Sequence, residues 1–585
     1  MRSRKKLYII IVILIIAVVG VKYFETGRSI EIVHGSTNMV IADGWNELVS
    51  RTVNDGRLKL SVDGKEVRLD PDDIYMDENM NIMINEEVIT SVFSCAVNRY
   101  YPGYTMIEKG NNAIIITAAS DTVNVNGEEQ IMVKPAVLHG SNMYIPLDAM
   151  STYFSYEYNW NSMTYTAELI NMKPDEKIYP YAYDYRKVGK GSAVKDQAEY
   201  GTCWAFASLT ALESSLMPDG FYNFSEDHMT WHSGYNLNQN QGGEFNMSMA
   251  YPCRFSGNSS RAAWKGPVYE EDDPYGDGYS PDGLEPAFHV QEMQIIESKN
   301  FDGIKKAVFL YGGVQSSLYL SVNDASGVGS SSYNSDTKSY CYIGTEKANH
   351  DIVIVGWDDS YPASSFATEP DGDGAFLCMN SWGENFGDKG YFYVSYYDSN
   401  IGVHNVAYTD IENKNNYNNI YQSDLCGWVG QLGYNREYAY FANAYEAKAD
   451  ETFEAAGFYA TGADTEYEMF FVEDFENDSS FINRIPVAKG SFANPGYYTV
   501  KADKPIPMKK GHKYAVVVYI KTPNSIHPIA IEYRADDATA TVDLTDGEGY
   551  ISLKGSRWEH VEETQNCNIC LKMYTNNIEE QGEEK

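Results

Sequence analysis

The stretch from Lys195 to Leu209 constrains the fold of this chain most, because a polar turn changes there into an apolar helical pattern. Apolar residues recur at intervals of three and four from Ala205 to Leu216, and Pro218 follows them. This pattern predicts a helix that ends just before the proline. Cys203 then lies at or next to the helix N-terminus, where free backbone N–H groups and the helix dipole favour a thiolate over a thiol. The sequence therefore predicts a reactive cysteine at the start of a helix.

Side chains whose chemistry complements a reactive cysteine occur both before and far after Cys203 in the sequence. Gln197 stands six residues before Cys203, so its amide can stabilise the oxyanion that forms when a carbonyl is attacked. His350 opens a continuous apolar run that predicts a buried strand. Asn380 follows a further strand-like run, and an amide there can hold one tautomer of the imidazole, while the indole of Trp382 keeps water away.

These residues resemble the papain family of cysteine peptidases, because four sequence blocks occur in the order typical of that family. The histidine follows the cysteine by about 150 residues, close to the family's separation. The four blocks are Gln197, Cys203-Trp204-Ala205-Phe206, Asn349-His350 and Asn380-Ser381-Trp382-Gly383.

The resemblance implies an α+β papain-like catalytic domain over residues 176–410, with a helical half and a β-barrel-like half. It makes Cys203 the nucleophile, paired as thiolate with the imidazolium of His350, and it implies a thiol pKa well below the free value near 8.5. Asn380 orients the imidazole, Gln197 completes the oxyanion hole, and neither a metal nor an organic cofactor is expected.

The resemblance also bears on the walls of the cleft. The glycine pair Gly242-Gly243 corresponds to one that lets the substrate backbone pair with the enzyme as an extended strand, and a plain tight turn is the alternative. The family usually joins two cysteines by a disulfide where this chain has Tyr200 and Asn240. We therefore expect packing to hold this wall.

Residues 57–170 show short strands broken by Asn and Gly turns. They resemble the small α+β module named after the N-terminal domain of copper amine oxidases, on the marks Tyr144-Ile145-Pro146-Leu147 and Asn159-Trp160-Asn161. No histidine cluster with copper-ligand spacing occurs there, and His139 alone predicts no metal site. No sustained helical periodicity occurs between residues 25 and 175, unlike the helical prosegment usual in papain-like zymogens. A spacer, a substrate-presenting domain and a replacement propeptide remain open roles for this module.

Residues 415–576 alternate between short strand patterns and turns, which predicts an all-β sandwich. They resemble the lectin-like domain found behind papain-type catalytic domains in some bacterial surface peptidases, on Ile420-Tyr421 with Gly427-Trp428 and on the run from Phe453 to Tyr459. A cell-surface glycan is therefore a candidate partner, although a sandwich core explains the aromatic residues equally well. Residues 577–585 form an acidic tail.

The first 24 residues differ from the rest of the chain. Basic residues precede an apolar run from Leu7 to Val21, which is typical of an export signal and equally of an uncleaved anchor over residues 7–24. Either alternative places the remainder of the chain outside the cell or on its surface, with membrane contact only through this N-terminal helix.

Charge and cysteine content narrow the function further. With 82 acidic and 45 basic residues the net charge is −37, which repels nucleic acid and excludes it as a partner. Eight cysteines are too few for a disulfide-built scaffold. Cys567 and Cys570 lie in an alternating strand pattern on opposite faces, so they predict no metal or redox pair.

The chain is therefore predicted to be an exported or surface-anchored cysteine endopeptidase that acts on protein or peptide substrates. A peptidoglycan amidase is a weaker alternative, since such enzymes lack the glutamine and the Asn-Ser-Trp-Gly block. The other alternative is a surface adhesin or binding protein in which the papain-like domain is secondary or inactive.

Overall fold

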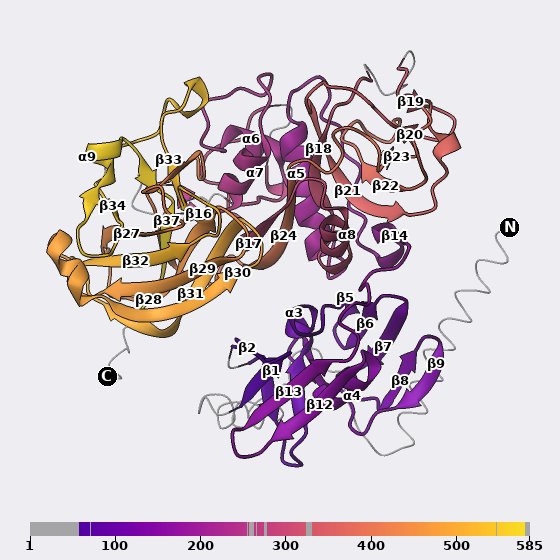
Figure 1. Cartoon of the computed structure of the whole chain (residues 1–585), viewed down its shortest axis with the longest axis horizontal. Helices are drawn as coiled ribbons and strands as arrows, with labels where there is room; N and C mark the ends of the chain where they lie inside the picture. Colours follow the sequence, from indigo (N-terminus) through magenta and orange to yellow (C-terminus); the bar gives the residue numbers. More distant parts are fainter. Residues whose placement is uncertain are drawn as a thin grey trace. The chain divides into compact units, whose positions relative to one another are not determined.

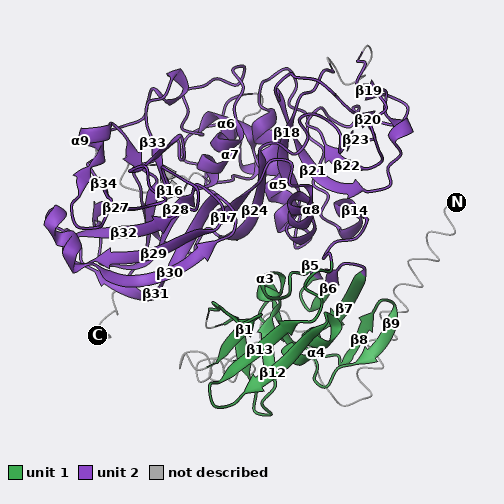
Figure 2. Cartoon of the chain, viewed as in Figure 1, with its two compact units in different colours: residues 1–97, 101–106, 112–176 green, residues 98–100, 107–111, 177–585 purple. Residues whose placement is uncertain are grey.

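The computed structural model describes residues 58–578, except 71, 254, 257–262, 265, 274–277, 323–329 and 546. The export signal or anchor predicted over residues 1–24, and the acidic tail beyond residue 578, lie outside the described residues. The chain divides into two compact units, which are residues 1–97, 101–106 and 112–176, and residues 98–100, 107–111 and 177–585 (Figure 2).

The region before residue 172 is built from short strands and short helices, as the sequence predicted. Two four-stranded sheets have the orders β12-β13-β1-β2 and β10-β11-β4-β3, and a five-stranded sheet runs from β5 to β9. The elements are β1 Lys59–Val62, β2 Lys65–Val67, β3 Ile74–Met76, β4 Ile82–Asn85, α3 Ile89–Phe93, β5 Ala96–Tyr101, β6 Tyr104–Lys109, β7 Asn112–Thr117, β8 Thr122–Val125, β9 Glu128–Ile131, β10 Val137–His139, β11 Asn142–Pro146, α4 Leu147–Tyr153, β12 Tyr156–Asn161 and β13 Thr166–Asn171.

The next region combines helices with a curved set of strands. Its elements are β14 Ala182–Asp184, α5 Cys203–Leu216, α6 Glu226–Trp231, α7 Phe245–Ala250, β15 Phe255–Ser256, β16 Ala263–Trp264, β17 Phe288–Ile296, α8 Phe301–Leu310, β18 Val314–Leu318, β19 Tyr333–Asn334, β20 Ser339–Tyr340, β21 His350–Asp358, β22 Ala375–Met379, β23 Tyr391–Ser395 and β24 Asn405–Asn413. Helix α5 is buried on most of its circumference, because it contacts α6, α7, β18, β21 and β24. The nearly continuous apolar run of β21 reflects burial on both faces.

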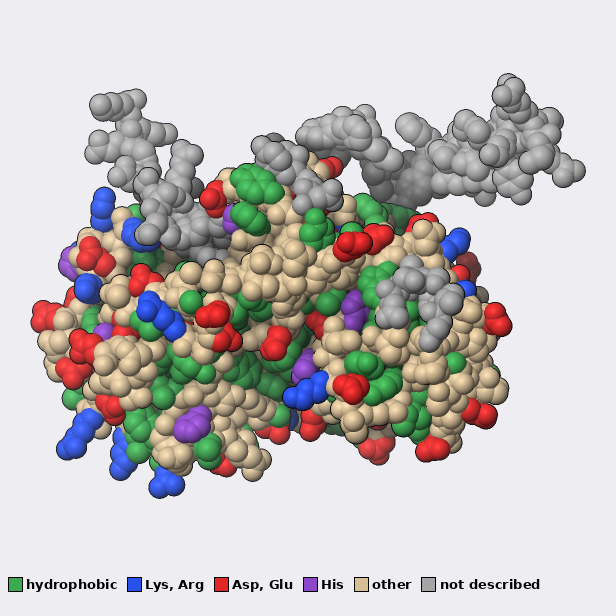
Figure 3. Space-filling model, turned by 90° about the horizontal axis from the view of Figure 1, so that it is seen from above, with side chains coloured by type: hydrophobic (Ala, Val, Ile, Leu, Met, Phe, Trp, Pro, Cys, Tyr) green, Lys and Arg blue, Asp and Glu red, His purple; other side chains and the backbone are tan. Residues whose placement is uncertain are grey.

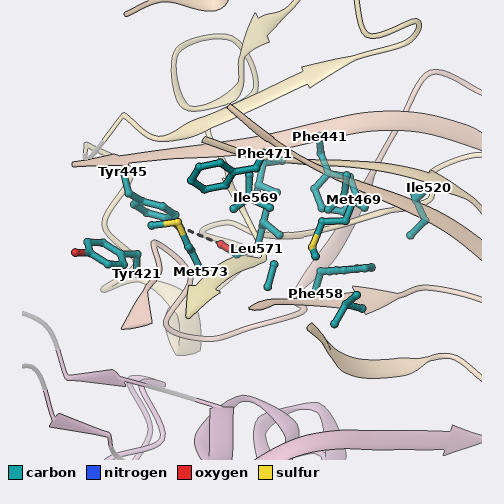
Figure 4. Packing of buried hydrophobic residues seen from close by; sticks show 14 of the residues in the cluster. Tyr421, Phe441, Tyr445, Phe458, Met469, Phe471, Ile520, Ile569, Leu571 and Met573 are labelled. Carbon is teal, nitrogen blue, oxygen red and sulfur yellow. Dashed lines mark hydrogen bonds between the residues drawn. The ribbon is translucent and has the colours of Figure 1, made fainter. Parts of the chain in front are cut away.

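The C-terminal region is built mainly of strands, with one short α-helix and two short 3-10 helices among its described residues, in agreement with the predicted sandwich. Its elements are β25 Asn419–Tyr421, β26 Gly430–Leu432, β27 Tyr438–Glu446, β28 Glu451–Ala460, β29 Thr465–Val472, β30 Ile485–Phe492, β31 Gly496–Met508, β32 Lys513–Lys521, β33 Ile529–Glu532, β34 Gly549–Ser552, β35 Glu559–His560, α9 Val561–Gln565, β36 Asn568–Ile569 and β37 Leu571–Asn577. Phe458, Phe471, Ile569 and Met573 are among the side chains that fill the core between its sheets (Figure 4).

One sheet runs without a break from the helical region into this sandwich. Its order is β19-β20-β23-β22-β21-β18-β24-β17-β31-β28-β37-β25, and Figure 1 shows β17 and β24 beside β31 and β28. Met293 of β17 pairs with Tyr497 of β31, and Gln294 pairs with Gly496. Because the joint is made of backbone pairing, the two regions form one compact unit.

None of the helices within the described ranges is long and apolar enough to cross a membrane. The same ranges hold no group of three or more His, Cys, Asp or Glu side chains placed to bind a metal ion.

Candidate active site

Cys203 is the first residue of α5, which confirms the predicted helix start. The thiol of Cys203 is free. The backbone N–H groups of Asp351, Trp204 and Cys203 lower the pKa of this thiol and so favour its thiolate. Cys203 lines a pocket of about 190 Å³ together with His350.

The imidazole of His350 is held by Asn380. The Nε2 atom of His350 lies 2.7 Å from Oδ1 of Asn380, and the backbone N–H of Ser381 donates to the same oxygen at 2.9 Å. A backbone N–H can only donate, so this second bond fixes which end of the amide is the oxygen. Nε2 therefore carries the proton, and Nδ1 is left able to accept one.

Trp382 lies beside this histidine. The ring centroids of Trp382 and His350 are 5.3 Å apart, and Trp382 also packs edge-on against Phe386 at 5.4 Å. His350 is buried, at 8% exposure. The indole is therefore one of the groups packed around the buried imidazole.

Burial shifts both reactive groups towards their neutral forms. It raises the pKa of the Cys203 thiol to about 12, and the Asp351 carboxylate nearby adds to the rise. It lowers the pKa of His350 to about 4, against the opposing hydrogen bond to Asn380. The prediction of a thiol pKa well below 8.5 is therefore wrong for this arrangement, because desolvation of the thiolate outweighs the helix N-terminus.

Gln197 is buried and firmly oriented. Its Oε1 accepts from the Ser381 hydroxyl at 2.5 Å, its Nε2 donates to the Tyr200 carbonyl at 2.7 Å, and its backbone N–H donates to the Ser381 carbonyl at 2.8 Å. The NH₂ group of this amide therefore faces the turn before α5. One of its two hydrogens is used by Tyr200, and the other can donate a further hydrogen bond. Gln197 and Thr202 line a second pocket of about 250 Å³.

The glycine pair approaches α5 closely. Gly243 lines the pocket of Cys203, and a Cβ at this position would overlap the indole nitrogen of Trp204. The backbone N–H of Gly201 donates to the Gln239 carbonyl at 2.8 Å, and a Cβ on Gly201 would lie 2.9 Å from the nitrogen of Gly242. Direct backbone contact thus links the two turns that the family usually joins by a disulfide.

A buried ion triad anchors the turn before the cysteine, and the sequence analysis missed it. The Nζ atom of Lys195 lies 2.7 Å from Glu213 and 2.6 Å from Glu226, and it also donates to the Phe224 carbonyl at 3.0 Å. Burial raises the pKa of Glu226 to about 8 although Lys195 opposes the rise. The only signal in the sequence was the capped helix start, where the hydroxyl of Ser225 accepts from the His228 N–H at 2.9 Å.

Ser381 and Asp351 are two further site residues that the sequence analysis did not single out. Ser381 holds both Gln197 and Asn380, as described above. Asp351 is 8% exposed, and its carboxylate accepts from the Ser317 hydroxyl at 2.5 Å and from the Gln315 amide at 3.0 Å. A signal was available for Asp351, since it places a charge inside an otherwise apolar strand.

Comparison with known proteins matches three successive regions. Residues 103–169 match the copper amine oxidase N-terminal domain, residues 179–411 match the papain family cysteine protease, and residues 420–575 match the lectin like domain. Cysteine proteinase 2 of Entamoeba histolytica is 27% identical over 233 residues, which are 38% of this chain and 66% of that protein.

Two solved structures combine the second and third regions. The clostridial cysteine protease Cwp84 after propeptide cleavage superposes with a TM-score of 0.59 at 26% identity, covering 68% of this chain and 99% of that one. The cysteine protease and lectin-like domains of Cwp84, described as a surface layer associated protein of Clostridium difficile, give 0.57 at 25% identity and cover 68% and 89%. Residues 179–411 are therefore a papain family cysteine protease domain, with a copper amine oxidase N-terminal domain before it and a lectin-like domain after it.

Proposed function

We propose that this protein is a cysteine endopeptidase that hydrolyses protein or peptide substrates. One observation carries the proposal. Cys203 at the start of α5 and His350, held by Asn380 with its proton on Nε2, line the same pocket. A nucleophile, an adjacent base and a group that orients the base are the arrangement that nucleophilic catalysis requires.

The reaction begins with a proton transfer inside the pair. The Cys203 thiol gives its proton to Nδ1 of His350, and the thiolate–imidazolium pair has the same total charge as the neutral pair. The thiolate attacks the peptide carbonyl, and the backbone N–H of Cys203 and the amide of Gln197 stabilise the oxyanion. The imidazolium then protonates the leaving amine. Afterwards the neutral imidazole activates water, which hydrolyses the thioester.

Burial makes the charged pair costly until something compensates for it. The hydrogen bond to Asn380 raises the pKa of His350 and so favours the imidazolium. The backbone N–H groups around the sulfur favour the thiolate. In this mechanism the charged pair forms only as the substrate is attacked, and the resting enzyme keeps a neutral thiol and a neutral imidazole.

The surroundings of the domain belong to the same proposal. We assign residues 57–170 to the small α+β module, 176–410 to the peptidase and 415–576 to the lectin-like sandwich. An extracellular or cell-surface location agrees with the surface-layer association stated for Cwp84, and residues 7–24 would serve as an export signal or as an anchor. A cell-surface glycan is the proposed partner of the lectin-like region, and the substrate backbone would pair along Gly242-Gly243.

Active-site titration tests the proposal. An epoxide thiol inhibitor should label the wild-type protein once, at Cys203, and should stop the hydrolysis of a denatured protein substrate. Cys203→Ala should take up no label and should cleave nothing, while it keeps the same unfolding midpoint. A protein that binds glycan-bearing cell walls but takes up no label would favour the adhesin.

A further inference from the structure

The pocket that Cys203 lines has an acidic floor. Asp351 is the residue after His350, it is 8% exposed, and it borders the pocket of about 190 Å³. Its two carboxylate oxygens accept hydrogen bonds from Ser317 and Gln315. The Nε2 of Gln315 also lies 3.4 Å from the Trp204 carbonyl. The carboxylate is therefore fixed in direction beside the nucleophile.

Burial and neighbouring ionisable side chains determine the charge of Asp351. The ionisable side chains that act on Asp351 are His404, which lowers its pKa, and Glu244, which raises it, while burial has the largest effect and raises it. Buried carboxylates are normally compensated by a cation. Figure 3 shows acidic side chains scattered across one face of the molecule, so the net charge of −37 does not by itself single out this pocket. The position of Asp351 in the lining is what distinguishes this pocket from the rest of the acidic surface.

The rim of the pocket adds a second carboxylate and an apolar surface. Glu244 is exposed at the N-cap of α7 and lines the pocket. The ring of Phe245 stacks on the ring of His404, with centroids 4.9 Å apart and an angle of 15° between the planes. A long side chain with an apolar stem and a cationic end fits a pocket with these two kinds of surface. Its stem would lie against Phe245 and its cation at Asp351.

We propose that this pocket selects a lysine or arginine side chain of the substrate, on the acyl side of the scissile bond. The proposal rests on the proposed peptidase function and names its substrate class. An acidic side chain would meet two carboxylates, and an apolar one would bury Asp351 without compensation.

The same contact links recognition to chemistry. The charge of Asp351 raises the pKa of the Cys203 thiol. A substrate cation that offsets the charge of Asp351 removes this contribution to the raised thiol pKa. A bound basic side chain therefore favours the Cys203 thiolate. The preference should therefore be seen in kcat as well as in KM.

A series of matched peptides tests the proposal. The peptides are identical except at one position, where lysine, arginine, norleucine or glutamate stands, and each position on the acyl side is varied in turn. At one position, kcat/KM for lysine should exceed that for norleucine by at least about tenfold, the size expected of a hydrogen bond to a buried charged group. Glutamate should be the poorest residue there.

Variants assign this preference to the carboxylates. Asp351→Asn should bring the lysine-to-norleucine ratio close to one. Glu244→Gln, which keeps a side-chain acceptor at the N-cap of α7, should lower the ratio by a smaller factor. Asp371→Asn removes an exposed charge elsewhere and should leave the ratio at its wild-type value.

The outcomes separate this proposal from the one on which it rests. Cleavage of the peptides with a ratio near one at every position overturns the basic specificity and leaves the peptidase standing. A strong ratio that is unchanged in both Asp351→Asn and Glu244→Gln also overturns it. If no peptide is cleaved and Cys203 takes up no inhibitor label, both proposals fail together.

Discussion

Replacing Asn380 by alanine tests the link between the tautomer of His350 and catalysis. The substitution removes the acceptor that lies 2.7 Å from Nε2. A neutral hydrogen bond of this kind contributes about 1 kcal/mol, and one to the imidazolium contributes about 1.5–3 kcal/mol. The imidazole then loses its preference for the Nε2–H tautomer, and the charged pair loses its support. We expect kcat/KM to fall about 10- to 100-fold, mainly through kcat.

The assay is hydrolysis of a peptide substrate, with the rate of thiol alkylation measured alongside it. Asn334→Ala is the matched control, because Asn334 also makes two hydrogen bonds, to the Ser365 carbonyl at 2.8 Å and from the Asp336 N–H at 3.1 Å. Both variants should lose stability, but only Asn380→Ala should lose activity beyond twofold. If Asn380→Ala keeps the wild-type kcat/KM and alkylation rate, the tautomer argument is refuted.

Three further changes probe the burial around the site and the joint between its regions. Burial lowers the pKa of His350 to about 4, so the unfolded chain binds more protons than the folded one below pH 6.5, and the free energy of unfolding should fall by up to about 3 kcal/mol between pH 6.5 and 4. In denaturant titrations at several pH values, His350→Gln should lose this part of the pH dependence, and an unchanged dependence in the variant contradicts the reasoning. Lys195→Met leaves two buried carboxylates without their cation, so the unfolding free energy should drop by about 3–5 kcal/mol, whereas a loss below 1 kcal/mol would mean that the triad contributes little. A Cβ at Gly496 would overlap the Met293 carbonyl, so Gly496→Ala should disrupt the pairing of β17 with β31, and limited proteolysis should then release the lectin-like region. If the variant resists the protease as well as the wild type does, the strand pairing tolerates the change.

The sequence was sufficient for the parts of the site that depend on local order. A helix that starts at a residue is encoded within a turn or two of it, so the position of Cys203 at the start of α5 followed from the polar turn and the apolar period. The spacing of the four papain-like blocks likewise led to the family that the comparison of residues 179–411 then showed.

Contacts between distant segments could not be predicted in this way. Ser381 reaches Gln197 across 184 positions, and Lys195 joins two glutamates that stand 18 and 31 residues away. Neither contact leaves a periodic pattern in the chain.

The thiol pKa shows the same division most clearly. From the helix N-terminus and a histidine partner the sequence predicted a lowered pKa, whereas the structure raises it to about 12, because burial removes water from the thiolate and Asp351 lies beside it. The ionisation of a group depends on every atom around it, and those atoms come from α5 and β21, which are about 140 residues apart in the chain.

By itself, the sequence indicated the candidate catalytic residues, the papain-like family and the all-β nature of the C-terminal region, since these are properties of short motifs and of strand periodicity. Only the tertiary structure decided that the sheet of the protease region continues through β17 into β31, and that an aspartate forms the floor of the pocket beside the nucleophile. Strand pairing and desolvation both depend on which distant segments meet, and the chain specifies that only through the fold as a whole.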